Sequence, residues 1–320
     1  MKFRISIFIS VICLSLSHFL VAGENGGYAG SFLRMGVGAR SNALGNAGVA
    51  DRPNGYSFYY NPSTAAFVEG KIISLSYSFM SLERRFNVIS YSMHVPPEAG
   101  LSIALVNTGV GDITAYNSLG EEAGTIEQWA NGVYFNFAKR FGEKLSFGLS
   151  LKYLREDINH KEYNYNASGW GFDFGGTYFL NDKITIGGAL RDVRSKLKAN
   201  TSDIFEFGGT TVDKFPVLYN VGFKYITPYP WLRILYDFEG SDKKEYRNHV
   251  GVEIVYIKGE MNGIGDNLSL CLGINEGEPT AGAGMVFNFL GHNSRLDYAF
   301  IPSYIDEGSS HIFSWQFFLK

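Results

Sequence analysis

The chain has 320 residues, of which 45% are hydrophobic and 18% are charged, and its formal net charge is -3 at pH 7. This balance provides no extended field of one sign, so it speaks against a protein that binds nucleic acid or an acidic substrate. The 38 glycines, 20 tyrosines and 26 phenylalanines favour extended strands, tight turns and aromatic surfaces over helices.

Residues 1–23 have the pattern of a signal peptide. The segment opens with Lys2 and Arg4, continues in an apolar run over residues 5–21, and ends in small residues before Glu24. We expect cleavage before Glu24 and export across the inner membrane, with an uncleaved anchor as the alternative. Beyond the leader no apolar run approaches the roughly 20 residues that a spanning helix needs, so the mature chain is either a soluble exported protein or a transmembrane barrel.

Residues 24–70 follow the leader and are too glycine-rich and too irregular for a membrane strand. Two stretches stand out, GSFLRMGVGARSNALGNAGVA over residues 30–50 and YYNPSTAA over residues 59–66. The segment is therefore treated as a unit of its own, ahead of the strands.

From Lys71 to the C-terminus the sequence alternates. In residues 145–153 the odd positions are apolar or aromatic, whereas the even positions are Ser, Gly, Ser and Lys. A period of two predicts strands with one apolar face and one small or polar face. About 14 such segments, each near the 9 to 11 residues of a tilted membrane strand, begin near Lys71, Phe86, Gly100, Asn131, Leu145, Ser168, Ile184, Phe215, Trp231, His249, Leu268, Thr280, Ser294 and His311.

The connections between these strands alternate in length. Short periplasmic turns, long external loops and an even strand count are typical of outer-membrane barrels. One turn, over residues 258–267, is longer than this rule predicts. The short turns lie at residues 96–98, 142–144, 181–183, 227–230 and 291–293, and the long polar loops at 109–128, 157–167, 192–214, 240–246 and 302–310.

A secreted soluble sandwich or propeller would also alternate. Against it, the apolar face carries more Phe, Tyr, Leu and Trp than a closed interior of about 14 strands could hold, whereas lipid can surround them. We also expect the tryptophans at or near strand ends, as in an interfacial aromatic girdle: Trp129, Trp170, Trp231 and Trp315. The predicted fold is an all-β, transmembrane antiparallel barrel over residues 71–320, located in the outer membrane.

The two N-terminal stretches and the strands after them resemble the PorV/PorQ family of outer-membrane proteins, which is related to the FadL-type transporters. The resemblance covers the mature chain nearly end to end, although Ser63 stands where the family commonly has Ala. It implies a 14-stranded barrel whose N-terminal segment, residues 24–70, folds inward as a plug, or hatch.

The residues of this segment suit a plug on their own terms. Asn61 can cap a short helix that Pro62 opens with its preset φ, and the neighbouring aromatic residues speak against the alternative of a solvated linker. Glycines allow close approach to the barrel wall at Gly36, Gly38, Gly45 and Gly48.

Charges on the small or polar face would point into the lumen, and they are mixed in sign. Mixed charge favours paired networks around a plug over an ion-selective open pore; a solvated wall is the alternative. The residues are Lys152, Asp173, Arg191, Lys224, Arg233, Asp237, Glu253 and Asp297.

No pattern indicates catalysis, a metal or a cofactor. The mature chain keeps one cysteine, Cys271, and so can form no internal disulfide. Gly36 and Gly38 do not form a dinucleotide fingerprint, because no Val-rich strand precedes them, and no nucleophile elbow is present. The histidines beyond the leader lack ligand spacing: His94, His160, His249, His292 and His311.

Two functions remain. PorV-like members work with type IX secretion, so the resemblance implies a barrel that carries or anchors exported proteins, with these proteins or secretion components as partners. FadL-like members transport hydrophobic small molecules such as long-chain fatty acids. A structural barrel without cargo is a third reading. In each case outer-membrane lipid surrounds the barrel, and no nucleic acid is involved.

Overall fold

The computed structural model describes residues 27–319 except 52, 203, 205, 206, 257–267 and 303–307. The predicted leader, its cleavage site and the long turn at 258–267 lie outside these residues. In the described part of the chain the strands are β1 (Lys71–Phe79), β2 (Arg85–Val95), β3 (Ala99–Tyr116), β4 (Glu122–Phe141), β5 (Leu145–His160), β6 (Asn164–Asn181), β7 (Ile184–Val193), β8 (Lys196–Asn200), β9 (Thr210–Lys214), β10 (Leu218–Ile226), β11 (Leu232–Ser241), β12 (Tyr246–Tyr256), β13 (Leu268–Asn275), β14 (Glu278–Phe289), β15 (His292–Ile301) and β16 (Ser310–Leu319).

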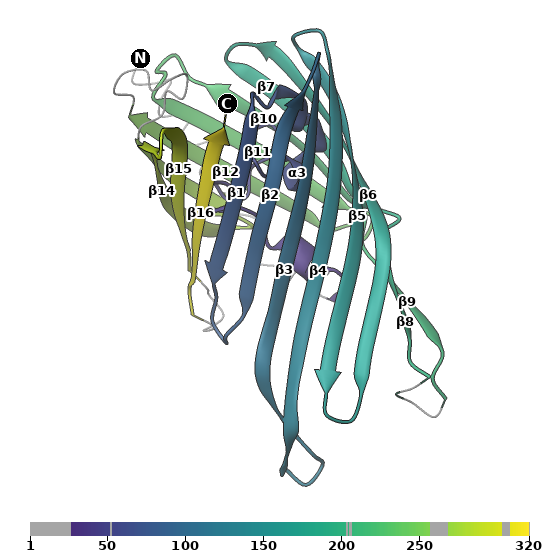
Figure 1. Cartoon of the computed structure of the whole chain (residues 1–320). Coiled ribbons are helices and arrows are strands. Elements are labelled where there is room, and N and C mark those ends of the chain that lie inside the picture. The colour runs from purple at the N-terminus through teal and green to yellow at the C-terminus, as the bar shows by residue number, and fades with distance from the viewer. Residues whose placement is uncertain are drawn as a thin grey trace.

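These strands form one antiparallel sheet that closes into a barrel (Figure 1). The sheet has 16 strands; β8 and β9 branch from β6, and the other 14 make the wall. The first and last strands close it, with Leu75 opposite Trp315. The predicted antiparallel barrel of 14 strands is confirmed.

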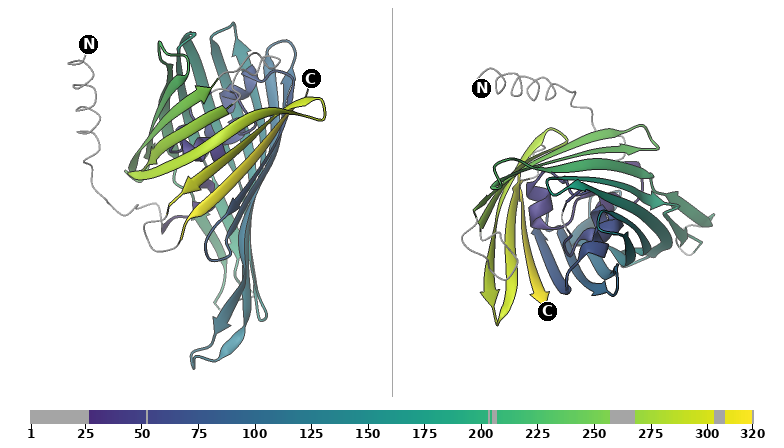
Figure 2. Two further views of the ribbon diagram at one scale, coloured as in Figure 1. Left: turned by 90° about the vertical axis from the view of Figure 1, so that its left-hand side faces the viewer. Right: turned by 90° about the horizontal axis from the view of Figure 1, so that it is seen from above.

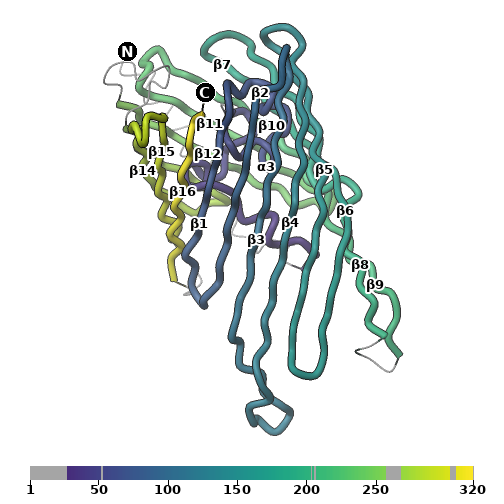
Figure 3. The backbone as a smooth tube through the Cα atoms, viewed as in Figure 1, coloured from purple at the N-terminus to yellow at the C-terminus, as the bar shows by residue number. Residues whose placement is uncertain are grey.

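Both strand termini of the wall, Lys71 and Leu319, are paired at the same end of the barrel. The short turns also lie at this end, whereas the longest strands project from the other end (Figure 3). Short turns and chain ends face the periplasm in barrels of this type. We therefore call this end periplasmic and the opposite end extracellular.

Large apolar side chains cover the outside of the wall, and small or polar ones face inward. Along β5, Leu149 is 42% exposed, whereas Ser150 is fully buried and donates a hydrogen bond to the carbonyl of Phe58 inside the barrel. Lipid solvates the outward aromatic and aliphatic groups, so their exposure costs nothing in the membrane. The burial therefore shows which face of each strand points outward and which points inward, a question that the two-residue period by itself leaves open.

Several predicted details are wrong. The loop expected over 109–128 is mostly strand, since β3 runs to Tyr116 and β4 starts at Glu122. The loop expected over 157–167 is also mostly strand, and the one expected over 192–214 holds β8 and β9. These residues form strands outside the lipid. A strand there does not need a continuous apolar face, so its sequence does not alternate strongly between apolar and polar residues. Three of the tryptophans expected near strand ends, Trp129, Trp170 and Trp315, lie inside strands. For the first two the reason is that β4 and β6 start earlier than predicted, whereas Trp315 lies in the middle of β16, whose start was predicted to within one residue.

In its described residues the N-terminal segment contains four short helices, and it lies inside the barrel, as the view down its axis shows (Figure 2). They are η2 (Ser31–Arg34), α2 (Ala39–Ala43), α3 (Ser57–Tyr60) and η3 (Pro62–Phe67). Each is too short to be stable alone, so the barrel wall must hold them in place.

Candidate functional site

The inner segment is fastened to the wall at Asn61. Its side-chain oxygen accepts a hydrogen bond from the Ser63 backbone N–H at the start of η3, which is the geometry of an N-cap, and Pro62 occupies the first turn. Its amide nitrogen donates to the carbonyls of Val49, at 2.8 Å, and Gly176 of β6, at 3.1 Å. One side chain thus joins two parts of the segment to the wall.

Close backbone approach explains Gly45. It has a φ of +66°, and a Cβ at this position would overlap the carbonyl oxygens of Val250 and Ile274 in β12 and β13. Any other residue would be strained and would push the segment from the wall. The other three glycines of the predicted set are packed against side chains of the segment itself: Gly36 against Asn46, Gly38 against Tyr56 and Gly48 against Tyr60.

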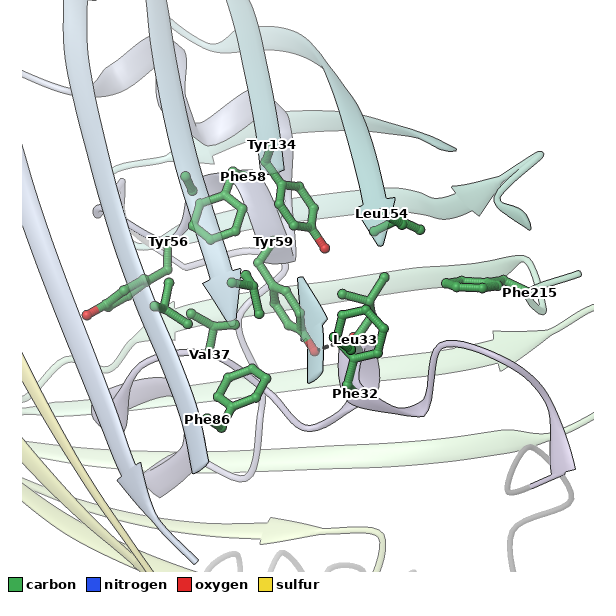
Figure 4. Packing of buried hydrophobic residues seen from close by; sticks show 14 of the residues in the cluster. Phe32, Leu33, Val37, Tyr56, Phe58, Tyr59, Phe86, Tyr134, Leu154 and Phe215 are labelled. Carbon is green, nitrogen blue, oxygen red and sulfur yellow. Dashed lines mark hydrogen bonds between the residues drawn. The ribbon is translucent and has the colours of Figure 1, made fainter. Parts of the chain in front are cut away.

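Aromatic residues of the segment form the main hydrophobic cluster inside the barrel (Figure 4). Phe58 lies 4.9 Å, centroid to centroid, from Tyr134 of β4. The hydroxyl of Tyr59 donates to the carbonyl of Leu33 at 2.7 Å. Because buried tyrosines need partners for their hydroxyls, this bond also ties α3 to η2.

A buried charge network holds the middle of the segment. Arg40 of α2 contacts Asp51 and forms a bidentate pair with Glu253 of β12, with both nitrogen–oxygen distances 2.8 Å. Lys224 reaches Asp51 at 3.2 Å, and Arg233 reaches Glu253 at 3.3 Å.

A second cluster lies in the wall between β5, β6 and β7. Lys152 pairs with Asp173 and with Asp192, each at 2.7 Å. Close by, the Arg191 guanidinium donates to the carbonyl of Leu33 and stacks 4.3 Å over the Tyr59 ring. This cluster therefore also reaches the inner segment.

The structure thus places every predicted inward charge on the lumen side. Asp237 accepts hydrogen bonds from the backbone N–H groups of Gly48 and Val49, at 2.7 and 2.8 Å. Asp297 pairs with Arg295 at 2.9 Å. Seven of the eight are buried and Arg233 is half-buried. Four of them contact the inner segment directly, namely Arg191, Lys224, Asp237 and Glu253.

Sequence reasoning missed several members of these networks. Arg295 stands two residues before Asp297 and shares its strand face, so period two could have found it. Arg40 and Asp51 lie in irregular chain, where no period shows which way a side chain points. The partners missed are Arg40, Asp51, Asp192, Glu239 and Arg295.

Little space remains inside the barrel. A polar cavity of about 20 Å³, enough for one water, lies between the segment and the extracellular half of the wall, lined by Arg34, Arg191 and Arg247 among others. A larger hollow of about 500 Å³ lies outside the lumen, on the exposed apolar face at the periplasmic ends of β11 to β13, and is lined by Trp231, Tyr256 and neighbouring apolar residues.

Strands β3 to β6 continue beyond the barrel mouth and, with β8 and β9, form a curved sheet (Figures 1 and 2). We call it the outer extension: residues 110–116, 122–128, 155–160 and 164–168 with β8 and β9. Its two faces differ from those of the wall in where the apolar and polar side chains lie. Along β5 the outward row changes from Leu149 and Tyr153 to Arg155, Asp157 and Asn159.

The inward face of the outer extension carries both apolar and polar side chains, since Glu156 and His160 share the inward row of β5 and Gln128 of β4 donates a hydrogen bond to Glu156 at 2.7 Å. Ile158 continues the inward row of the buried Leu154, and Tyr165 stands directly opposite it. Ile126 of β4 and Ile113 of β3 also stand directly opposite each other. On β8, Leu197 and Ala199 are buried inward while Lys196 and Lys198 are exposed. The extension thus presents a concave surface above the plugged lumen, with isoleucines among polar side chains.

No helix among the described residues is long and apolar enough to cross a membrane. Within the same residues no group of His, Cys, Asp and Glu side chains could hold a metal ion.

A closed wall of 14 strands with an apolar exterior and a lumen filled by the N-terminal segment defines an outer-membrane β-barrel with an internal plug. A family model described as type IX secretion system protein PorV matches residues 27–204. This match spans more than half of the 320 residues. The chain belongs to the PorV family.

Solved structures with a similar fold are transporters and their homologues. The toluene transporter TbuX of Ralstonia pickettii has a TM-score of 0.63 at 12% identity over 89% of this chain and 99% of that chain. The toluene transporter TodX of Pseudomonas putida has 0.58 at 12% over 88% and 96%. A FadL homologue of Pseudomonas aeruginosa has 0.56 at 8% over 87% and 97%. At these identities the likeness concerns the fold alone. Among curated proteins no match was found.

Proposed function

We propose that this PorV-family barrel serves protein secretion at the outer membrane by receiving exported polypeptides on its extracellular side. The observation that carries this proposal is the concave face of the outer extension, with its group of isoleucines. Apolar side chains such as Ile113, Ile126 and Ile158 stand beyond the barrel mouth, where water and not lipid surrounds the sheet. A group of apolar side chains in such a place is characteristic of a protein interface.

The filled lumen supports a docking role over passage through the barrel. The inner segment is held by buried ion pairs at Arg40 and by the cap at Asn61, and the cavity beside it has room for about one water. The role is non-catalytic. The leader, residues 1–23, directs export across the inner membrane and is removed before Glu24.

Transport of a hydrophobic small molecule is the second candidate. The structures of similar fold include proteins described as toluene transporters, and a concave surface with a group of isoleucines would also collect such molecules. This function requires the plug to move, since the described lumen leaves no passage of that size.

A pair of double variants separates the two functions. Ile126→Asp with Ile158→Asp places charges on the concave face, whereas Thr125→Asp with Asn159→Asp places them one residue away on the convex face. Each variant replaces the chromosomal copy, and surface-displayed proteins are quantified on intact cells together with toluene and fatty-acid uptake.

We expect the concave variant to lower surface display at least tenfold and the convex variant to leave it unchanged. Loss of uptake with normal display would instead support the transporter function. Equal display in both variants would refute docking on the concave face. Heat-modifiable migration in gels verifies that both barrels are assembled.

A further inference from the structure

The first described residues lie at the extracellular end of the barrel. The Tyr28 ring lies 5.4 Å from the ammonium of Lys243, in the extracellular turn between β11 and β12. Gly30 packs against Phe215, which is buried just before the extracellular start of β10. The Arg34 guanidinium donates to the carbonyls of Tyr28, at 3.2 Å, and Ala29, at 3.1 Å, and so holds this end in place.

The other end of the segment lies at the periplasmic side. Phe67 packs edge-on against Phe179 of β6, with ring centroids 4.7 Å apart. The carbonyl of Gly70 accepts a hydrogen bond from the backbone N–H of His94, at the periplasmic end of β2. Residues 28–70 therefore pass through the lumen from the extracellular mouth to the periplasmic rim, as the purple trace in Figure 2 shows.

We infer that the mature amino terminus is presented at the cell surface, at the foot of the outer extension. Cleavage before Glu24 leaves three residues ahead of Gly27, which span at most about 10 Å when fully extended. The wall is much taller, since even the nine-residue strand β1 covers about 30 Å along its length. Three residues cannot return the amino group to the periplasm.

Because the segment passes through the lumen from one mouth to the other, it restricts both how the barrel assembles and how the plug can move. The strands close around a segment whose start is already outside, so the leader has to be removed before the barrel closes; otherwise an apolar segment would be left on the outer side. The segment also contacts the barrel at both mouths, through Tyr28 and Gly30 at one and through Phe67 at the other. It cannot swing into the periplasm as a lid hinged at Lys71.

Cysteine labelling in intact cells tests the inference. Gly27→Cys places a thiol at an exposed position where an added Cβ meets nothing within 4 Å. Two exposed positions provide controls: Glu121→Cys in the extracellular β3–β4 turn and Glu143→Cys in the periplasmic β4–β5 turn. The native Cys271 is buried, and the unsubstituted chain gives its background. A membrane-impermeant maleimide is applied before and after permeabilisation.

We expect Gly27→Cys to react in intact cells within about twofold of Glu121→Cys, while Glu143→Cys reacts after permeabilisation alone. Reaction of Gly27→Cys after permeabilisation alone, or no reaction under either condition in an assembled barrel, would overturn the inference. The labelling does not depend on secretion. Normal surface display with periplasmic labelling would therefore refute the threading and leave the proposed function intact.

A leader variant tests the order of events. Gly23→Arg is designed to block cleavage, and we expect it to abolish heat-modifiable barrels in the outer membrane while the uncleaved chain accumulates. Assembly of an uncleaved barrel with Gly27→Cys still reactive from outside would show that removal of the leader is not required.

Discussion

At the scale of single residues, the surroundings of a side chain change along one strand and one face. Leu149 and Asn159 both point outward from β5, but the first lies in the apolar band and the second in the polar outer extension. The same substitution should therefore have different costs at these two positions, which locates the edge of the membrane on this strand.

Leu149→Arg places a guanidinium toward lipid and is expected to lower the free energy of unfolding by about 2 to 4 kcal/mol near the midplane. Asn159→Arg, on the same face but in water, should leave stability unchanged. Denaturant titration of the barrel in phospholipid vesicles measures both. Equal losses at the two positions would mean that the apolar band extends over the outer extension.

Arg40 offers a test of the buried network. Arg40→Met removes the cation from between Asp51 and Glu253 and leaves two buried carboxylates short of a partner, which is expected to cost about 3 to 5 kcal/mol. Arg155→Met breaks the pair with Asp157 on the exposed outer surface and should cause no measurable change. A thermal melt in detergent compares the two; similar melting temperatures would argue against a structural role for the network.

At the scale of elements, the four short helices of the plug depend on the wall for their stability. The cap at Asn61 shows how this works, because one side chain begins η3 and also bonds β6. Period-two patterns describe strands well, but they carry no information on such irregular elements. Their positions follow from pairs that meet across the lumen.

Asn61→Ala removes the cap and is expected to cost at least about 1 kcal/mol, with more from the carbonyls of Val49 and Gly176 that lose their donor. We expect brief opening events in planar bilayers to become more frequent. Asn164→Ala, at an exposed position on the extracellular end of β6, is the matched control. No difference in opening frequency between the two variants would mean that η3 does not limit movement of the plug.

At the scale of the whole molecule, the wall and the plug contribute differently to the folded structure. The wall satisfies its own backbone hydrogen bonds by closing between β1 and β16, so it needs no plug to remain in lipid. The plug fills a space that 14 strands enclose but that wall side chains cannot fill by themselves.

Deleting residues 27–60 should therefore leave an assembled barrel with a water-filled lumen. We expect its conductance in planar bilayers to rise from nearly closed to porin-like, because the inner wall is lined by small and polar side chains. Heat-modifiable migration controls for assembly. An assembled deletion variant with unchanged conductance would show that the segment does not close the barrel.

The sequence by itself determined the barrel. Period two from Lys71 onward, turns of alternating length and an excess of bulky apolar residues predict 14 wall strands, because lipid imposes one apolar face on each of them. The inward charges of regular strands, such as Lys152 and Asp173, could be placed for the same reason.

Only the tertiary structure determined the long-range contacts that a two-residue period cannot specify. Arg40 and Asp51 meet Glu253 across the lumen from irregular chain, and Tyr28 reaches Lys243 at the extracellular mouth. The outer extension remains paired without the strong alternation that lipid demands, so the sequence pattern predicts loops there. Long-range contacts of this kind form after the wall has closed, so no local pattern specifies them.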